Sequence, residues 1–377
     1  MGERGQVVLV TGWPGFIGRR LVQALAAGLD RARDRVVLFT RERHAEAGRA
    51  ELAALGVEGE VLEGDVTRMH LGLAGAEYKR LVADVTHVWH LAALYDVAAD
   101  LDRIRAVNLE GTRTMLELAR TARGLQRFNH FSTAYVSGDR EGVIVEEELD
   151  LGQRFNNPYE RSKFEAERLV RRAMAEIPAT VYRPSIVVGD SRTGEIDRFD
   201  GPYYLAILLV ASPLGMPLPL PGRGTAPLNV VPVDFVVDAA LSIGGNPAAA
   251  GKTVHLVDPS PLSARTVYEL VAKRAGKTLP PVSLPHQAVE ALLGLPLLER
   301  LARPHRNAIR LVNRLAIYNC ANQLALLGGT GVRCPPITSY LDRLMDFVQT
   351  HFSATPPTRD GGADEDPLDP APLSTNG

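Results

Sequence analysis

Short runs of apolar residues alternate with segments of helical periodicity through most of the chain. The runs that predict buried strands are 7–10, 35–40, 61–65, 87–93, 127–136, 179–184, 228–237 and 252–258. The segments that predict helices are 16–26, 105–120, 157–172 and 264–275. Because right-handed crossovers join strands that alternate with helices in this way, the pattern predicts an α/β fold with a doubly wound parallel sheet.

The alternation weakens after residue 188, where we expect a second region to begin. We predict a dinucleotide-binding Rossmann domain at 1–188, and residues 229–257 also belong to it. A smaller, mostly helical substrate-binding region is predicted at 189–228 and 258–353, and a disordered tail at 354–377. The tail is rich in Pro, Asp, Gly and Ser, and it has few large apolar residues that a folded core would require.

Two segments of the substrate-binding region have open interpretations. Residues 202–224 are apolar, but their prolines exclude a membrane-spanning helix, so no transmembrane segment is expected. This segment either lines a pocket for an apolar substrate or forms a packed connector. Residues 286–327 predict amphipathic helices with many arginines. These helices form either an ordinary surface or a face that contacts a membrane periphery or a carrier protein.

A glycine-rich turn follows the first predicted strand. Gly12, Gly15 and Gly18 have the spacing of a dinucleotide-binding turn. The first glycine permits the tight turn, the second lets a pyrophosphate approach the backbone, and the third lets helix and strand pack closely. The phosphates would lie at the helix N-terminus, where free N–H groups favour anions. Glycine clusters often mark ordinary turns, but the position of this one between a strand and a helix favours a cofactor site.

Two side chains bear on the choice of cofactor. Arg41 follows the second strand, where an arginine binds the 2′-phosphate of NADP and an acidic residue binds the ribose of NAD. This position predicts NADPH rather than NAD, although Arg41 is also typical of a solvated charge at a helix start. Asp65 ends the third strand, where it either binds the adenine amino group or caps the next helix.

Composition excludes several classes of function. The formal net charge of −2 over 377 residues gives no field that favours nucleic acid or an anionic membrane. Two cysteines, Cys320 and Cys334, fit neither a disulfide framework nor a zinc site, and no metal is expected. The N-terminus leads straight into the first strand and leaves no room for a signal peptide. We therefore expect a cytoplasmic protein.

The candidate catalytic residues lie at the end of the fifth predicted strand and on the helix that follows it. Tyr159 and Lys163 lie one helical turn apart on one face, and the lysine ammonium favours the phenolate form of the tyrosine. Only five of the 42 basic residues are lysines, so this lysine is unlikely to be background. Thr133, with or without Ser132, could share a substrate carbonyl oxygen with Tyr159, although polar residues also simply end strands. His90 is interpreted as a packing histidine rather than a metal ligand.

Together these motifs resemble those of the extended short-chain dehydrogenase/reductases over roughly residues 5–260. The motifs are Thr11-Gly12-x-x-Gly15-x-x-Gly18, Asp65, His90-Leu91-Ala92-Ala93, Asn108, Ser132-Thr133, Tyr159-x-x-Ser162-Lys163 and Arg183-Pro184. The resemblance implies that Thr133, Tyr159, Lys163 and Asn108 are catalytic. It implies that the cofactor contacts Thr11, Gly12, Gly15, Phe16, Ile17, Gly18, Arg41, Asp65, Val66, Ala92, Ala93, Tyr159, Lys163, Pro184 and Ile186.

Three stretches, 131–138, 183–191 and 229–234, are similar to the male-sterility and fatty acyl-CoA reductase branch and to thioester reductase domains. This resemblance implies NADPH-dependent reduction of an acyl thioester, linked to CoA or a carrier, or of a derived aldehyde or ketone. It also implies a homodimer formed through 105–120 and 160–172. The alternatives are a nucleotide-sugar epimerase or dehydratase, a hydroxysteroid-type dehydrogenase, and a non-catalytic dinucleotide sensor.

Overall fold

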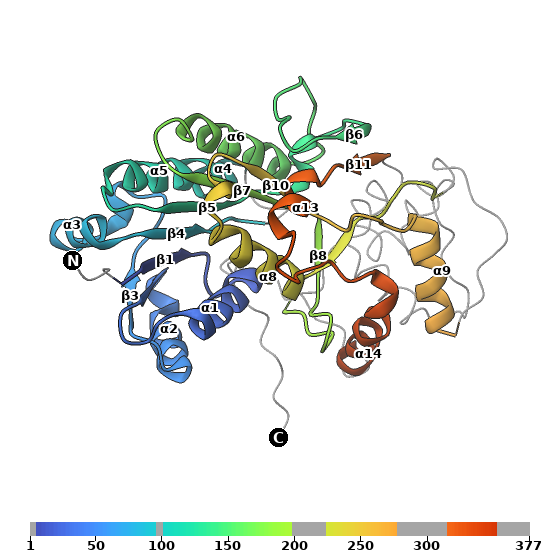
Figure 1. Cartoon of the computed structure of the whole chain (residues 1–377), viewed down its shortest axis with the longest axis horizontal. Helices are drawn as coiled ribbons and strands as arrows, with labels where there is room; N and C mark the ends of the chain where they lie inside the picture. Colours follow the sequence, from blue (N-terminus) through green and yellow to red (C-terminus); the bar gives the residue numbers. More distant parts are fainter. Residues whose placement is uncertain (1–4, 96–100, 198–223, 277–314, 353–377) are drawn as a thin grey trace.

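Seven parallel strands form the central sheet of a computed structural model that describes residues 5–95, 101–197, 224–276 and 315–352 (Figure 1). The strand order is β10-β7-β5-β4-β1-β2-β3. The strands are β1 Val7–Thr11, β2 Arg35–Thr40, β3 Gly59–Glu63, β4 His87–His90, β5 Arg127–Phe131, β7 Ala179–Pro184 and β10 Thr253–Leu256. The order reverses between β1 and β4, which is where doubly wound sheets bind ligands. The predicted fold class is confirmed.

Helices cover both faces of the sheet (Figure 1). One face carries α3 Gly75–Asp84, α4 Leu101–Arg105, α5 Gly111–Thr121 and α6 Pro158–Ala173, and the other carries α1 Phe16–Gly28, α2 Glu42–Leu55 and α8 Val233–Gly244. Alternate residues of a strand serve opposite faces. Leu9 packs in the apolar cluster with α5 and α6, whereas Val8 and Val10 pack in the cluster with α1 and α8. A strand buried on both sides therefore has an unbroken apolar sequence.

Smaller elements complete the described chain. Two parallel pairs lie outside the main sheet, β8 Ile186–Val188 with β9 Val230–Pro232, and β6 Gly142–Ile144 with β11 Ala316–Tyr318. The remaining helices are α9 Ala264–Arg274, α13 Ala321–Leu327 and α14 Leu341–Phe352. Short turns are η1 Met69–Gly72, η2 Ala106–Glu110, η3 Ala134–Ser137, η4 Pro247–Ala249 and η6 Ile337–Ser339.

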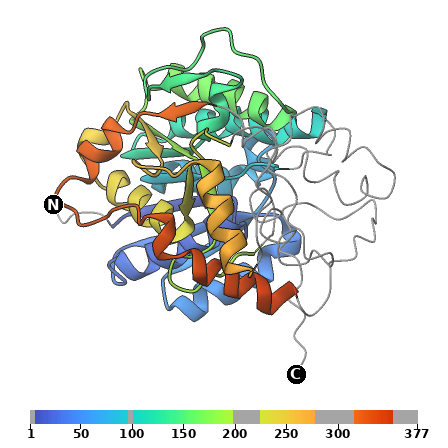
Figure 2. The ribbon, with the colours of Figure 1, turned by 90° about the vertical axis from the view of Figure 1, so that its right-hand side faces the viewer.

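Helices α9 and α14 pack together with the β8–β9 pair around an apolar cluster of their own, and Figure 2 shows them in front of the main sheet. Helix α13, in contrast, packs against β10 and α8. Part of the C-terminal chain therefore lies directly on the dinucleotide-binding fold. In the described ranges, no helix combines the length and the apolar character needed to span a bilayer.

Three local predictions were wrong. The strand expected at 127–136 ends at Phe131, and the turn η3 Ala134–Ser137 follows it because the Thr133 hydroxyl accepts a hydrogen bond from the Tyr135 N–H at its start. The strand expected at 228–237 is a strand only at Val230–Pro232, and the helix α8 begins at Val233. The polar positions of α8, Asp234, Asp238 and Ser242, recur at helical spacing, but the run 228–237 includes only the first of them. A short, mostly apolar run does not separate helix from strand. Within 286–327, Ala316–Tyr318 is a strand because it pairs with β6.

Several sequence expectations concern residues outside the described ranges. They are the apolar segment 202–224 except its last residue, most of the arginine-rich helices at 286–327, and the tail at 354–377.

Candidate active site

The turn between β1 and α1 requires its glycines. Gly12 has φ +85°, and a Cβ there would come within 2.6 Å of the Leu91 carbonyl carbon. A Cβ on Gly15 or Gly18 would lie 2.8 Å or 2.5 Å from the Gly12 carbonyl oxygen. No side chain fits between these backbones, so the turn leaves bare backbone at the start of α1. That arrangement fits the pyrophosphate of a dinucleotide.

A hollow continues from this turn across the carboxyl ends of β1, β2 and β3. It is lined by Gly12, Trp13, Pro14, Gly15, Phe39, Thr40, Arg41, Arg43, His44, Gly64, Asp65, Val66, Ala92 and Val107. Three of its lining residues, Arg41, Arg43 and His44, have basic side chains. The Asp65 Oδ1 atom accepts hydrogen bonds from the Thr67 N–H and hydroxyl, both at 2.8 Å. Asp65 thus orders its own loop as well as lining the hollow.

A directed chain of hydrogen bonds connects the glycine turn to η2. The Thr112 hydroxyl donates to the Asn108 carbonyl oxygen at 2.7 Å, so it accepts from Nε2–H of His90 at 3.0 Å. His90 Nδ1 then accepts from the Thr11 hydroxyl at 2.9 Å, and that hydroxyl accepts from the Ala92 N–H at 3.2 Å. Burial and then the charge of Lys163 lower the pKa of His90 to about 3, so the ring is neutral.

Asn108 lies in the π-helical turn η2, a conformation that is frequent at functional sites. Its Oδ1 accepts from the Leu94 N–H at 2.6 Å, and its Nδ2 donates to the Leu94 carbonyl at 3.1 Å and to the Ser162 hydroxyl at 2.8 Å. The Ser162 hydroxyl donates to the Tyr159 carbonyl at 2.8 Å. The two N–H groups of the Asn108 amide are both used, and the amide joins the chain after β4 to helix α6.

Helix α6 carries Tyr159 and Lys163. The N-terminus of this helix is stabilised because the Asn157 side chain accepts a hydrogen bond from the Glu160 N–H at 2.8 Å and because proline occupies the first helical position. The Lys163 ammonium is 3% exposed and donates to the Phe131 carbonyl at 2.5 Å. Burial lowers the pKa of Lys163 to about 8, and Glu167 opposes this shift. Lys163 therefore ties α6 to the last residue of β5.

The two hydroxyl residues after β5 have different partners. The Thr133 hydroxyl donates to the Pro184 carbonyl at 3.5 Å and accepts from the Tyr135 N–H at 3.3 Å. The Ser132 hydroxyl donates to Glu167 Oε2 at 2.6 Å. Ser132 therefore faces α6, whereas the Thr133 hydroxyl contacts the end of β7 and the turn η3.

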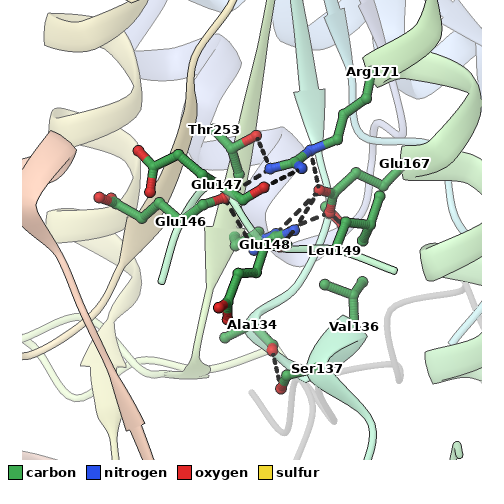
Figure 3. Close-up of polar contacts among 12 residues, drawn as sticks. Ala134, Val136, Ser137, Glu146, Glu147, Glu148, Leu149, Glu167, Arg171 and Thr253 are labelled. Carbon is green, nitrogen blue, oxygen red and sulfur yellow. Dashed lines mark hydrogen bonds and ion pairs between the residues drawn. The ribbon is translucent and has the colours of Figure 1, made fainter. Parts of the chain in front are cut away.

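A buried ion pair that the sequence did not suggest supports this end of the sheet. Arg183 Nη2 lies 2.7 Å from Glu167 Oε1, and the two side chains are 1% and 0% exposed. Arg171 also contacts Glu167, at 3.2 Å (Figure 3). Burial alone would raise the pKa of Glu167, but the charge and hydrogen bonds of Arg183 lower it. The sequence signal that could have indicated this ion pair was Glu167, one helical turn after Lys163, together with Arg183 near the end of a predicted strand.

The same arginines hold the acidic loop that follows β6. Arg171 donates to the carbonyl oxygens of Glu146 at 2.7 Å and Glu147 at 2.6 Å (Figure 3). The Glu146 carboxylate accepts from the N–H groups of His255 at 2.9 Å and Asn322 at 2.7 Å. Although this loop is acidic, it is a structural connection between α6, β10 and α13.

Other residues expected to contact a cofactor lie in different surroundings. Val66 lines the hollow and packs against Gly111, where a Cβ would meet its Cγ2 at 2.8 Å. Phe16 and Ile186 both pack against the apolar cluster of α9 and α14, whereas Ile17 packs with α1 and α8. Ala93 is half-buried after β4. Phe16 and Ile186 thus mark the boundary between the sheet and the smaller cluster.

Both cysteines are free thiols, and burial is the largest cause that raises the pKa of each. In the part of the chain that the structure describes, no group of three His, Cys, Asp or Glu residues has the arrangement of a metal site.

Comparison with known proteins gives consistent matches. Residues 10–240 match a family model described as male sterility protein. The crystal structure of the terminal R domain from the myxalamid PKS-NRPS biosynthetic pathway has a TM-score of 0.78 and 26% identity, covering 92% of this chain and 91% of that chain.

Two curated relatives are much longer than this chain. The nonribosomal peptide synthetase asaC of Aspergillus flavus is 26% identical over 357 residues, which cover 86% of this chain and 34% of that protein. A carboxylic acid reductase of Segniliparus rugosus is 27% identical over 272 residues, which cover 63% of this chain and 23% of that protein. The chain therefore spans about a third or less of the length of these relatives.

Proposed function

The chain belongs to the male sterility protein family, a branch of the extended short-chain dehydrogenase/reductases, and from this premise we propose that it is an NADPH-dependent reductase of acyl thioesters. The observation that carries the proposal is the hydrogen bond from Lys163 to Phe131. This bond joins the helix of Tyr159 to the last residue of β5, two residues before Thr133. The similarity to a carboxylic acid reductase and to a terminal R domain supports a thioester carbonyl as the target.

The proposed cofactor is NADPH rather than NADH. The turn at Gly12, Gly15 and Gly18 would hold the pyrophosphate, and the hollow beyond it would hold the adenosine. Arg41, which lines that hollow with other basic side chains, suits a 2′-phosphate because guanidinium groups bind phosphate oxygens well. When bound there, NADPH supplies hydride to the substrate carbonyl carbon.

The side chains after β5 and on α6 would stabilise the negative charge on the substrate oxygen and supply the proton. As the carbonyl carbon is reduced, negative charge develops on its oxygen, and hydroxyl groups placed there stabilise it. We assign this role to Thr133 and Tyr159. Collapse of the oxyanion breaks the carbon–sulfur bond, so that a thiolate leaves and an aldehyde remains. A second reduction, to the alcohol, would require a second molecule of NADPH to supply hydride to the aldehyde. Tyr159 would then donate its proton to the alkoxide oxygen, and the ammonium of Lys163 would stabilise the resulting phenolate.

The substrate would be a small molecule that is apolar or is linked to CoA or to a carrier protein. No role for nucleic acid is proposed, since the net charge of −2 provides no attraction to it. Cytoplasmic location, peripheral membrane contact and a homodimer through the surfaces of α5 and α6 remain predictions, as does the division into two domains.

The direct test follows nicotinamide absorbance during incubation with octanoyl-CoA or octanal. We expect wild-type protein to oxidise NADPH with octanoyl-CoA, and Tyr159→Phe to lower kcat by about 10²–10⁴-fold, the usual contribution of a positioned acid. Tyr78→Phe is the matched control, because Tyr78 lies on α3 and stacks on His70. Unchanged turnover by Tyr159→Phe would contradict the proposed roles. No turnover of either substrate would contradict the proposed reductase activity.

A further inference from the structure

Tyr95 lies against the candidate catalytic tyrosine. The ring centroids of Tyr95 and Tyr159 are 4.8 Å apart, and their planes cross at 88°. This edge-to-face geometry is a favourable arrangement for two aromatic rings. Tyr95 is 43% exposed, and Tyr159 is also partly exposed. The pair therefore presents aromatic surface beside the hydroxyl to which we assign the proton.

A single amide anchors the backbone of both tyrosines. Asn108 binds the N–H and the carbonyl of Leu94, the fully buried residue that precedes Tyr95. The same amide donates to the hydroxyl of Ser162, which in turn donates to the Tyr159 carbonyl. Asn108 thus fixes the chain on each side of the pair. This hold fixes the backbone from which the Tyr95 ring projects, and the edge-to-face contact orients that ring as a wall beside Tyr159.

We propose that Tyr95 is a specificity-determining residue that contacts the acyl group next to the reacting carbonyl and selects unbranched chains. The inference rests on the proposed function. A carbonyl oxygen within hydrogen-bonding reach of Tyr159 brings the first carbons of the acyl chain beside the Tyr159 ring, and therefore beside the ring that touches it. An unbranched chain covers the exposed apolar face of Tyr95, which removes that surface from water. A methyl branch at C2 collides with the ring.

The test compares octanoyl-CoA with 2-methyloctanoyl-CoA in wild-type protein and in Tyr95→Ala, Tyr95→Leu and Tyr95→Phe. The quantity measured is the ratio of kcat/KM for the branched substrate to that for the linear one. We expect Tyr95→Ala to raise this ratio at least tenfold, since one methyl group in a packed pocket changes discrimination by about 10–200-fold. Tyr95→Phe keeps the ring and should keep the wild-type ratio.

Control measurements separate selectivity from positioning. Tyr78→Ala removes a tyrosine on α3 and should leave the ratio unchanged. A dissociation constant for NADPH close to the wild-type value, measured by protein fluorescence, shows that a variant is folded. If Tyr95→Ala does not bind NADPH, Tyr95→Leu is used in its place. A ratio that stays within twofold of wild type in the folded variant overturns the proposal. An equal loss of activity on both substrates also overturns it, because Tyr95 would then act only by orienting Tyr159.

Failure of the proposed function gives a different result. If wild-type protein binds NADPH but reduces neither acyl-CoA, the same ratio is measured with octanal and 2-methyloctanal. If Tyr95→Ala raises the ratio of kcat/KM for 2-methyloctanal to that for octanal tenfold, the role of Tyr95 beside the carbonyl is supported. The substrate is then an aldehyde rather than a thioester. No reduction of any of the four compounds by wild-type protein overturns both the proposed function and the role of Tyr95.

Discussion

The Ser132 hydroxyl donates a 2.6 Å hydrogen bond to the buried carboxylate of Glu167. Ser132 is therefore committed to helix α6, while Thr133, the next residue, contacts the carbonyl of Pro184 at 3.5 Å. Adjacent hydroxyl residues at the end of β5 thus have different surroundings, and we expect them to have separable effects on stability and on catalysis.

Exchange of each hydroxyl residue for alanine should show this separation. Thr133→Ala should lower kcat by about 10²-fold or more, the usual loss when a donor to a developing oxyanion is removed. It should also lower the free energy of unfolding by about 0.5–2 kcal/mol, because the Thr133 hydroxyl caps η3. Ser132→Ala should lower the free energy of unfolding by about 1–3 kcal/mol, because a hydrogen bond to a buried charge is lost. Urea denaturation and steady-state kinetics on both variants provide the measurements. Equal losses of kcat in the two variants would show that Ser132 also acts on the substrate.

The Glu167–Arg183 ion pair should be important for stability. Glu167→Gln leaves the buried guanidinium of Arg183 without its counter-charge, and removal of one partner of a buried pair costs about 3–5 kcal/mol. Glu176→Gln is the matched control, because Glu176 pairs with Arg120 at the surface, where the two side chains are 54% and 38% exposed. Such a pair contributes about 0–1 kcal/mol. Similar urea midpoints for the two variants would contradict the importance of the buried pair.

Lys163 should make stability depend on pH above neutrality. Its pKa is lowered from 10.5 to about 8 by burial, so between these pH values the unfolded chain binds more protons than the folded one. The contribution of Lys163 to the free energy of unfolding therefore rises with pH through this window. Between pH 8 and 10.5, the free energy of unfolding of wild-type protein should rise by roughly 3 kcal/mol relative to that of Lys163→Met. This value follows from about 1.4 kcal/mol for each unit of pKa shift. Parallel stability profiles of the two proteins from pH 8 to 10.5 would show that the ammonium is not buried as described.

Arg41 should decide between the two nicotinamide cofactors. Arg41→Ala should weaken NADPH binding by about tenfold or more, because a charge-assisted bond to phosphate is lost, and should leave NADH binding nearly unchanged. Arg49→Ala is the control, since Arg49 pairs with Glu63 and is absent from the lining of the hollow. Fluorescence titration with each cofactor gives both constants. Equal weakening of the two cofactors would remove Arg41 as the source of NADPH preference.

Most strands of the sheet could be predicted from the local amino-acid sequence. The strand expected at 35–40 is observed at Arg35–Thr40, and the one expected at 179–184 at Ala179–Pro184. Both are buried on two faces and contain β-branched or aromatic residues, although β7 also buries Thr180 and Arg183. The start of helix α8 was mistaken for a strand because residues 228–237 include only one of its polar positions, Asp234, and the helical period shows only when Asp238 and Ser242 are included.

The sequence by itself determined the glycine turn and the placement of Tyr159 and Lys163 one turn apart on one helix, because each depends on spacing within one turn or one helix. Only the tertiary structure decided which hydroxyl of the Ser132–Thr133 pair faces away from α6, and only it brought Asn108 to Ser162, 54 residues away. These contacts join segments that become neighbours through the order of the strands. Long-range hydrogen bonds of this kind leave no periodic trace in the chain, because their partners are set by the packing of the sheet and its helices.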